Sequence, residues 1–560
     1  MRTRRSRWTV AAALAAAGLT SCSSSPSPAQ LSPGPNGIGS TEAALPSLAQ
    51  ALAGARDLGP LPGSTTLDLS FGLAGQDPGG LQSLLDQGEQ VLPSVYADRF
   101  GPDPALVEPV VTALRNAGLT ATWIPGEPTL SVAGTVSTVD RLLGVTIDQW
   151  VGADGTRFYA PAQLPPIPPS LAAVVNGIIG LDDYPSEHPL DSYSPAIGVT
   201  PAQMLDFYDI NPLRRAGLDG KGMTVAFPEG CRYTQANLNE YAQKFSLPAF
   251  GVQVAAKEFG QPEADCVEAD LDLEVVHAVA PAAREVVYYA APDPADIAAA
   301  EAQMYLDYPR AEIESDSWGG CESTDESPFA HTLEDEQQAA AAEGWSIFVA
   351  SGDLGAFDCG PDGQLATDLD GGIPSITSVG GTYVELGKGG AYFAETAWGE
   401  PLEQAGGGGG LSILWQRPAW QAGPGVVNQY SNGMRQTPDV SANADPESGW
   451  EVYAGGMSQP LPVGGTSAAA PFWAAVTALI DQNLQQRGLS TAGFANPALY
   501  DFGEHPGGLP APAFHDITQG TNLYYPAAPG WDFATGLGSP DVAALADDFA
   551  WYEQAHRTSG

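Results

Sequence analysis

The chain has 560 residues, 43% of them hydrophobic, so it is long enough to bury the cores of two or three domains. Its 66 Asp and Glu residues outnumber its 22 Lys and Arg residues and give a formal net charge of -44 at pH 7. Such a surface repels nucleic acids and anionic lipids, because phosphate groups are bound by basic side chains. The acidic composition suits either function in acid or a general adaptation to solubility and salt, and composition alone favours neither.

The N-terminus has the pattern of a bacterial export signal. Basic residues within 1–7 precede a short Ala-rich apolar run over 8–19, which is too short to span a membrane. The run ends in Leu-Thr-Ser-Cys, a lipobox in which Cys22 becomes the lipidated first residue. We therefore expect a lipoprotein signal peptide at 1–22, a lipid anchor on Cys22, and an extracellular or cell-surface location. The alternative is an export signal without lipid, in which this cysteine occurs by chance.

Four further cysteines favour two disulfides. They are Cys231, Cys266, Cys321 and Cys359. An even number in an exported chain indicates disulfide pairing, with three ways to pair them, and none has the close spacing of a zinc site. Sequence proximity favours Cys231 with Cys266 and Cys321 with Cys359.

The first third of the chain predicts a tether, a small domain and a linker. Residues 23–58 are rich in Ser, Pro and Gly and are typical of a flexible tether. A compact α+β domain is expected at 59–185, because 64–73 and 129–143 alternate in the manner of strands and 104–119 has helical spacing. The polar, Pro-containing segment 186–199 is typical of an exposed linker.

Residues 200–550 predict a larger α/β domain with a parallel sheet, because apolar strand candidates alternate with helical segments. The strand candidates are 223–228, 284–290, 345–351 and 375–384, and the helix candidates are 236–245, 294–304 and 329–343. In such sheets functional side chains gather at the carboxyl ends of the strands.

The stretch GGTSAAAP, residues 464–471, places Ser467 at the start of an apolar helix predicted over 467–486. The free N–H groups at a helix start can stabilise an oxyanion, and subtilisin-like proteases present their nucleophilic serine in this way. The alternative is a serine that caps a buried helix. A subtilisin also needs a histidine followed by glycine, and none of the six histidines has that neighbour.

Carboxylates can supply the missing base. Glu268 and Asp272, in EADLDLE, are four residues apart and so lie on one face of a predicted helix. Two carboxylates held close together share protons, and a glutamate oriented by an aspartate can take the proton of a serine at acidic pH. Asp353, in ASGDLG at the end of a strand candidate, can donate a hydrogen bond to an oxyanion when it is protonated. Read singly, these are also the patterns of a solvated acidic helix face and of an Asp in a Gly-rich turn.

Together and in this order, EADLDLE, ASGDLG and GGTSAAAP resemble the sedolisin family of serine-carboxyl peptidases, near its kumamolisin branch. The resemblance extends to ESDSWGG, GGGGGLSILWQRPAWQ, PDVSANADPESGW and GWDFATGLGSP. It implies a subtilisin-like catalytic domain at 200–550, preceded by a ferredoxin-like activation prodomain at 59–185. The roles implied are Ser467 as nucleophile, Glu268 as base and acid, Asp272 as its orienting partner and Asp353 as oxyanion donor.

The resemblance also implies a supporting tryptophan and a calcium site. Trp318 is expected to support the catalytic carboxylates or line the cleft. Some relatives have a further acid near the first strand, where the alignment slips by one residue at Glu229, so we leave that role unassigned. One structural Ca²⁺ is expected on oxygen atoms of two carboxylates and three backbone carbonyls. These ligands are Asp516, Ile517, Ala528, Gly530 and Asp532.

These features predict an exported, acid-acting endopeptidase made as a self-processing zymogen, monomeric, with protein or peptide substrates and its own prodomain as inhibitor. A tripeptidyl-peptidase of the same fold is the first alternative. A non-catalytic peptide-binding module is the second, and a subtilisin-type protease that uses His277 as base is the third. The sequence leaves substrate preference and the exact processing site open.

Overall fold

The computed structural model describes residues 39–40, 48–194, 198–264, 266–308, 312–322, 327–359, 364–454, 459–506 and 509–557. The predicted signal peptide with Cys22 lies outside these residues, as does most of the predicted tether. Among the helices that are described, we find none with the length and apolar character needed to cross a membrane.

Residues 48–181 contain two antiparallel sheets and short helices. One sheet has the strand order β4 (Thr120–Thr122), β5 (Thr129–Thr135), β3 (Thr66–Leu73), β8 (Val175–Ile179), and the other has the order β2 (Arg56–Pro60), β6 (Ile147–Val151), β7 (Arg157–Pro161). The helices are α1 (Leu48–Gly54), α2 (Pro78–Leu85), α3 (Pro93–Arg99), α4 (Pro104–Asn116) and α5 (Val136–Leu143). The expected combination of helices and strands is therefore present.

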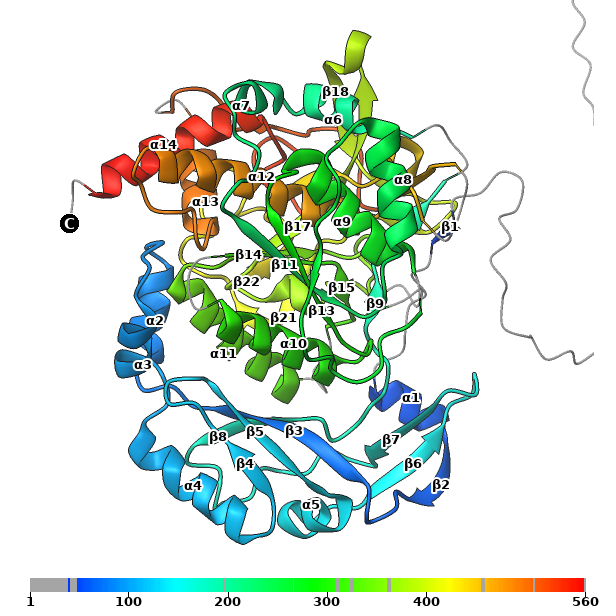
Figure 1. The fold of residues 1–560 in the computed structure, drawn as a ribbon, viewed down its shortest axis with the longest axis vertical. Helices are drawn as coiled ribbons and strands as arrows, with labels where there is room; N and C mark the ends of the chain where they lie inside the picture. The colour runs from blue at the N-terminus through cyan, green and yellow to red at the C-terminus, as the bar shows by residue number, and fades with distance from the viewer. Residues whose placement is uncertain are drawn as a thin grey trace, which may run out of the picture. The chain divides into compact units, whose positions relative to one another are not determined.

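The prediction of strand throughout 129–143 is wrong in its second half, where the chain forms α5. Val136, Val139 and Leu143 are buried at helical spacing on that element, so they face the core as a helix and not as a strand. Gly144 ends the helix with φ 66°, a conformation that glycine adopts without steric cost. In Figure 1, α4 and α5 lie together on one side of the sheet that contains β3 and β5.

The larger domain is built on a mainly parallel sheet, as predicted. Its strand order is β12 (Gln253–Val254), β13 (Arg284–Tyr289), β11 (Thr224–Glu229), β14 (Ile313–Asp316), β16 (Ser346–Ala350), β17 (Thr377–Leu386), β18 (Tyr392–Ala397), with β23 (Val440–Asn443) paired to β17. Only the β17–β18 pair of this sheet is antiparallel. Strand β11 is buried along its whole length, which is typical of a parallel strand covered on both faces.

Helices cover both faces of this sheet (Figure 1). Helices α10 (Pro294–Asp307) and α11 (Ser327–Glu343) pack on one face, and α12 (Thr466–Gln486) packs on the other. Helix α9 (Val267–Val279) lies against α12, and α8 (Gln235–Phe245) lies against α9. Further helices are α6 (Pro201–Phe207), α7 (Asn211–Arg215), α13 (Asn496–Glu504) and α14 (Val542–Arg557).

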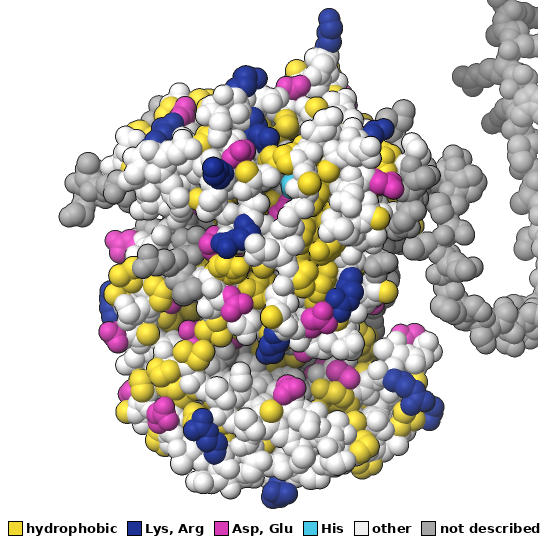
Figure 2. Space-filling view, in the orientation of Figure 1, with side chains coloured by type: hydrophobic (Ala, Val, Ile, Leu, Met, Phe, Trp, Pro, Cys, Tyr) yellow, Lys and Arg dark blue, Asp and Glu magenta, His cyan; other side chains and the backbone are white. Residues whose placement is uncertain are grey.

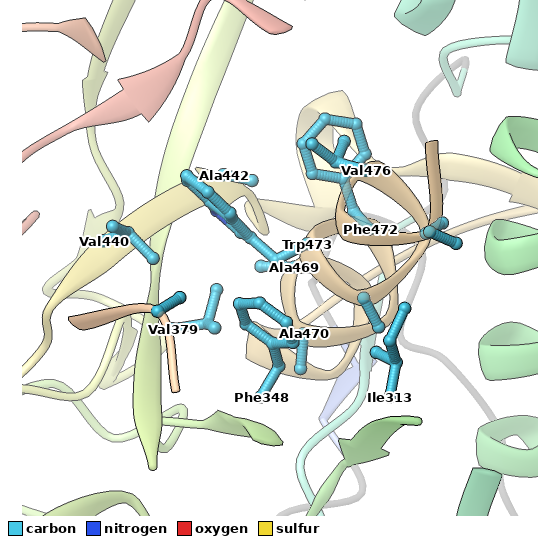
Figure 3. Packing of buried hydrophobic residues seen from close by; sticks show 14 of the residues in the cluster. Ile313, Phe348, Val379, Val440, Ala442, Ala469, Ala470, Phe472, Trp473 and Val476 are labelled. Atoms are coloured by element: carbon cyan, nitrogen blue, oxygen red, sulfur yellow. The ribbon is translucent and has the colours of Figure 1, made fainter. Parts of the chain in front are cut away.

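Helix α12 is the central helix of the domain. Ala469, Ala470 and Trp473 on α12 pack against Phe348 of β16 and Val440 of β23, as Figure 3 shows. Small alanine side chains let the helix approach the sheet closely, and its N-terminal residues are therefore held in a fixed position. The Trp473 Nε1–H also donates to the Ser441 carbonyl at 3.0 Å, so the large ring leaves no buried donor unpaired.

The two predicted disulfides, Cys231–Cys266 and Cys321–Cys359, are both present. The first closes the segment that leads into α9, and the second joins the chain after β14 to the loop after β16. On the face in Figure 2, the Lys and Arg side chains of the described residues are scattered and gather in no continuous basic patch.

Candidate active site

Ser467 lies at the N-terminus of α12, in the first turn of the helix. Strand β25 (Leu461–Gly464) leads into the helix through Gly465, whose φ of 91° is unfavourable for any residue with a side chain. Ser467 is fully buried, and its hydroxyl donates to the Ser317 carbonyl at 3.4 Å. Its backbone N–H points away from the helix, toward the carbonyl of Leu190 at 3.2 Å.

Glu268 and Asp272 lie one turn apart on α9, in the part of that helix that packs against α12. Both carboxyl groups are buried, and the Asp272 Oδ1 accepts a hydrogen bond from the Ser317 hydroxyl at 3.0 Å. The Ser467 hydroxyl lies close enough to the Glu268 carboxyl to lower its pKa. Neither Glu268 oxygen forms a hydrogen bond of standard geometry, so this contact is looser than a full bond.

Burial raises the pKa of Glu268 and of Asp272 well above their ordinary values. The negative charge of Asp272 and then that of Asp191 raise the pKa of Glu268 further, because like charges in a low-dielectric site cannot both ionise easily. The two carboxyls therefore retain protons to a higher pH than isolated carboxyls do.

Asp353 follows β16 and faces the N-terminus of α12. Its Oδ1 accepts from the Thr466 N–H at 2.7 Å and from the Thr466 hydroxyl at 3.0 Å. Its Oδ2 lies beside Gly465 and accepts from the Ser192 hydroxyl at 3.1 Å. The structure thus brings the four residues predicted for catalysis to one place, although they come from α9, the loop after β16 and α12.

Glu229 and Trp318 complete this cluster. Glu229 ends β11 and is fully buried, and the Trp318 Nε1–H donates to its Oε2 at 3.4 Å. Burial and then the charge of Asp272 raise the pKa of Glu229 well above its ordinary value. The sequence left Glu229 unassigned because it falls one position from the expected acid. Its place at the carboxyl end of a central strand was the signal that could have found it.

His277 does not contact this cluster. Its Nδ1 lies 3.2 Å from Glu285 Oε1, its Nε2 lies 2.9 Å from the Pro248 carbonyl, and its ring stacks on Phe250. Because both ring nitrogens have other partners, the alternative in which His277 is the base of a subtilisin-type site has no support in the geometry.

Residues 186–194 of the predicted linker pass through the site, so the expectation that this part of it is exposed is wrong. Strand β9 (His188–Pro189) pairs antiparallel with β15 (Trp318–Gly319), and β10 (Ser192–Tyr193) pairs antiparallel with β25. Leu190 and Asp191, which join the two strands, are each only 1% exposed. Backbone pairing on both sides of Ser467 buries a segment whose polar composition predicted a solvent-exposed loop.

The residues predicted to hold calcium also lie together. The Gly530 N–H donates to both carboxyl oxygens of Asp516, at 3.1 and 3.2 Å, and the Ala528 N–H donates to Asp532 Oδ2 at 2.7 Å. Within the described ranges no group of three or more His, Cys, Asp or Glu side chains is arranged to hold a metal. Two carboxylates next to backbone carbonyls form a different donor set, one of hard oxygen atoms that suits Ca²⁺.

The comparisons with known proteins agree in pointing to one family. The model of the pro-kumamolisin activation domain matches residues 53–184. The chain is 32% identical to kumamolisin from a Bacillus species over 441 residues, which cover 74% of this chain and 77% of that protein. It is 27% identical to sedolisin from a Pseudomonas species over 487 residues, 80% of each chain. It is 30% identical to human tripeptidyl-peptidase 1 over 253 residues, 41% of each chain.

Among solved structures, the chain is similar to Pseudomonas sedolisin, described as a serine-carboxyl proteinase complexed with two molecules of pseudo-iodotyrostatin. The TM-score is 0.54 at 25% identity, and the match covers 65% of this chain and 99% of that chain. Nearly the whole of that structure thus has a counterpart here.

The many buried carboxyls predict that the folded chain is more stable in acid than at neutral pH. Desolvation raises the pKa of Glu314, Asp370, Asp445 and Asp481 to about 7. Because these values lie above those of the unfolded chain, the folded state binds protons more tightly. This stabilisation is fully present below about pH 4 and is lost as the pH rises through about 7.

Thermal unfolding of the Ser467→Ala chain, which lacks the hydroxyl that could attack a peptide bond, should therefore show a higher Tm at pH 5 than at pH 8. Asp481→Asn keeps an acceptor for the Ala492 N–H but cannot ionise, so it should reduce this difference, whereas Asp98→Asn at an exposed position should not. A Tm that rises from pH 5 to pH 8 would contradict the prediction.

Proposed function

Because the chain belongs to the sedolisin family of serine-carboxyl peptidases and carries an activation prodomain, we propose that it is an acid-acting endopeptidase made as a self-processing zymogen. The observation that supports the proposal is the extended segment bound across Ser467, whose hydroxyl lies beside the buried Glu268 carboxyl. Protein and peptide chains that can adopt this extended form are the proposed substrates, and the enzyme is proposed to act as a monomer.

In the proposed reaction, Glu268 takes the proton of the Ser467 hydroxyl as the oxygen attacks a peptide carbonyl carbon. Asp272 shares its proton with Glu268 and keeps that carboxyl available as a base, and the Ser317 hydroxyl holds Asp272 in place at 3.0 Å. The oxyanion is stabilised by the Ser467 N–H and by a protonated Asp353. A carboxylic acid can donate that hydrogen bond only while it is protonated, so the mechanism requires acid.

Endopeptidase action is supported by the length of chain that the cleft holds. In a tripeptidyl-peptidase, the N-terminus of the bound substrate lies three residues before the bond that is cut. Here the segment extends more than three residues before Leu190, whose carbonyl accepts from the Ser467 N–H, since the Ser186 carbonyl and the Glu187 side chain lie beside Gly320. Glycine at this position leaves room for a continuing chain. The tripeptidyl-peptidase alternative is favoured only by relatives with that name.

The prodomain is proposed to act as an intramolecular inhibitor. Its strand β8 and helix α11 of the catalytic domain are in contact, and Asn176 Nδ2 donates to Asp335 Oδ2 at 2.6 Å. Gly72 on β3 allows the same helix to approach, because a side chain there would collide with Thr332. A prodomain fixed in this way holds residues 186–194 in the cleft, where they exclude other substrates.

Replacement of Ser467 by Ala should lower the rates of maturation and of digestion of a denatured protein at about pH 4 by roughly 10⁴- to 10⁶-fold, because the proposed acyl-enzyme can no longer form. Glu268→Gln should have a comparable effect, since glutamine cannot take up the proton. Gel electrophoresis measures maturation, and the release of soluble peptides measures digestion. The exposed-position controls Ser490→Ala and Glu403→Gln should retain wild-type rates.

If Ser467→Ala matures alone at the normal rate, the proposed nucleophile is wrong. Stoichiometric peptide binding without turnover at any pH would favour the non-catalytic module instead. Release of tripeptides from free N-termini, with no cleavage of N-terminally blocked peptides, would favour the tripeptidyl-peptidase.

We further propose that Asp516, Asp532 and the carbonyls of Ile517, Ala528 and Gly530 hold one structural Ca²⁺. The donor set supports it, because hydrogen bonds from Gly530 and Ala528 already bring both carboxylates against the loop that carries the carbonyls. The ion would neutralise these carboxylates and fix the loop between them.

Equilibrium dialysis should therefore find one bound Ca²⁺ per chain, and a chelator should lower the Tm. Asp516→Asn should reduce Ca²⁺ affinity by at least about 10-fold because it removes a negatively charged ligand. Asp98→Asn at an exposed position should leave the affinity unchanged. Undiminished Ca²⁺ binding by a chain with both Asp516→Asn and Asp532→Asn would exclude this site.

We also propose that the protein is exported and anchored at the cell surface by lipid on Cys22. The signal-like residues 1–22 support this proposal. In a bacterial host, labelled fatty acid should be incorporated into the wild-type chain, and Cys22→Ser should lose the label and move from the membrane fraction to the medium. Incorporation of label into Cys22→Ser would argue against the anchor.

A further inference from the structure

We propose that the peptide bond between Leu190 and Asp191 is the bond that the enzyme cuts in its own chain, and that its cleft prefers a medium-sized apolar side chain before the cut. This inference rests on the proposed function and specifies it further: it identifies the processed bond and the class of substrate. It follows from the way in which residues 186–194 lie in the site.

On the N-terminal side, the segment is bound as an added strand. Pro189 is paired with Trp318 and His188 with Gly319 in antiparallel register, and the Leu190 N–H donates to the Ser317 carbonyl at 3.1 Å. Backbone pairing of this kind fixes the position of the chain without depending on its side chains, so an extended substrate can bind in the same register.

The Leu190 carbonyl lies where an attacked carbonyl has to lie. Its oxygen accepts the backbone N–H of Ser467 at 3.2 Å and lies beside Gly465, next to which the Asp353 Oδ2 is also placed. These are the two groups proposed to stabilise the oxyanion. A side chain on Gly465 would collide with both oxygens, which explains why glycine is needed there.

On the C-terminal side, the segment is bound by a different strand. Ser192 is paired with Gly464 and Tyr193 with Val463, and the Ser194 N–H donates to the Pro462 carbonyl at 3.2 Å. The chain therefore changes its pairing partner from β15 to β25 at Leu190–Asp191. The bond at which the partner changes is also the one whose carbonyl accepts from the Ser467 N–H, so this bond and not its neighbours lies at the nucleophile.

The Leu190 side chain indicates the preference of the site. Leu190 is 1% exposed and belongs to the main hydrophobic core of the catalytic domain. A Cβ placed on Gly319 would collide with the Asp368 carboxyl and would lie 3.1 Å from Leu190 Cδ1, so the absence of a side chain at 319 leaves room for both side chains. A glycine before the cut would lose the apolar contacts that the buried Leu190 side chain makes.

The reaction balances in two steps. In the first, Ser467 Oγ bonds to the Leu190 carbonyl carbon and its proton passes to Glu268, which returns it to the leaving nitrogen of Asp191 as the C–N bond breaks. In the second step, a water molecule gives a proton to Glu268, and the oxygen of that water bonds to the Leu190 carbonyl carbon. The ester to Ser467 breaks, and the hydroxyl regains the proton. The products are a prodomain that ends at Leu190 and an enzyme that begins at Asp191.

The first test is the identity of the first cut. The purified full-length chain is brought to pH 4, samples are quenched at short times, and intact masses and N-terminal sequences are determined. The first new N-terminus should be Asp191. A first cut at any other bond of residues 186–199 would overturn the assignment. A chain that cleaves neither itself nor any peptide at any pH would instead refute the proposed function.

The second test is the side chain before the cut. Leu190→Gly should slow the first cut by about 10-fold or more, the effect of removing an apolar side chain from a fitted pocket. Leu402→Gly, at a position that is 92% exposed, is the matched control and should mature at the wild-type rate. Maturation of Leu190→Gly at the wild-type rate would overturn the preference.

A third measurement does not depend on the folding of a variant. The matured wild-type enzyme is given the peptide Glu-His-Pro-Leu-Asp-Ser-Tyr, which is residues 187–193, with blocked ends. Mass spectrometry should show cleavage between Leu and Asp. The same peptide with Gly in place of Leu should be cut at a rate that is lower by about 10-fold or more. Cleavage at another bond, or equal rates for the two peptides, would contradict the inference, whereas digestion of other peptides in the same assay would leave the proposed function intact.

Discussion

The arrangement of this site depends on carboxyl groups that are buried close to one another. Glu268 and Asp272 on α9, Glu229 on β11 and Asp191 of the linker lie in a region from which water is excluded. Full ionisation of such a group is unfavourable, because no solvent compensates the repulsion between like charges. In the proposed mechanism, the protons that these groups retain allow one carboxyl to act as a base while its neighbours stay neutral. The proposed function in acid follows from this constraint.

The fold meets this constraint by packing α9 against α12. Alanine side chains on α12 allow close approach to the sheet, and the contact with α9 buries the carboxyls beside Ser467. Ser317, between β14 and β15, then joins the two helices: its hydroxyl donates to Asp272, and its carbonyl accepts from Ser467. A displacement of either helix would separate the Ser467 hydroxyl from Glu268, its proposed base. The geometry of the site therefore depends on the packing of the core.

In the proposed function, the linker occupies the cleft both as an inhibitor and as the segment that is cut during maturation. The prodomain contacts α11, and the residues that follow it pair with β15 and β25 on the two sides of Ser467. Under that proposal, a segment held in this way blocks the cleft and is also the first substrate. The pairing is backbone to backbone, so residues 186–194 need no apolar pattern to bind, and their polar composition predicted an exposed loop instead.

The amino-acid sequence by itself indicated the family and the parallel sheet, and it identified Ser467, Glu268, Asp272 and Asp353 as candidates. These depend on local signals: alternation of apolar residues, spacing on one helix face, and short motifs in a characteristic order. The segment 129–143 was misread because its apolar spacing fits a strand in the first half and a helix in the second. What only the tertiary structure decided is which groups meet: the place of Glu229 beside Trp318, the engagement of His277 elsewhere, and the course of the linker past Ser467. These depend on contacts between residues far apart in the chain, which no local pattern encodes.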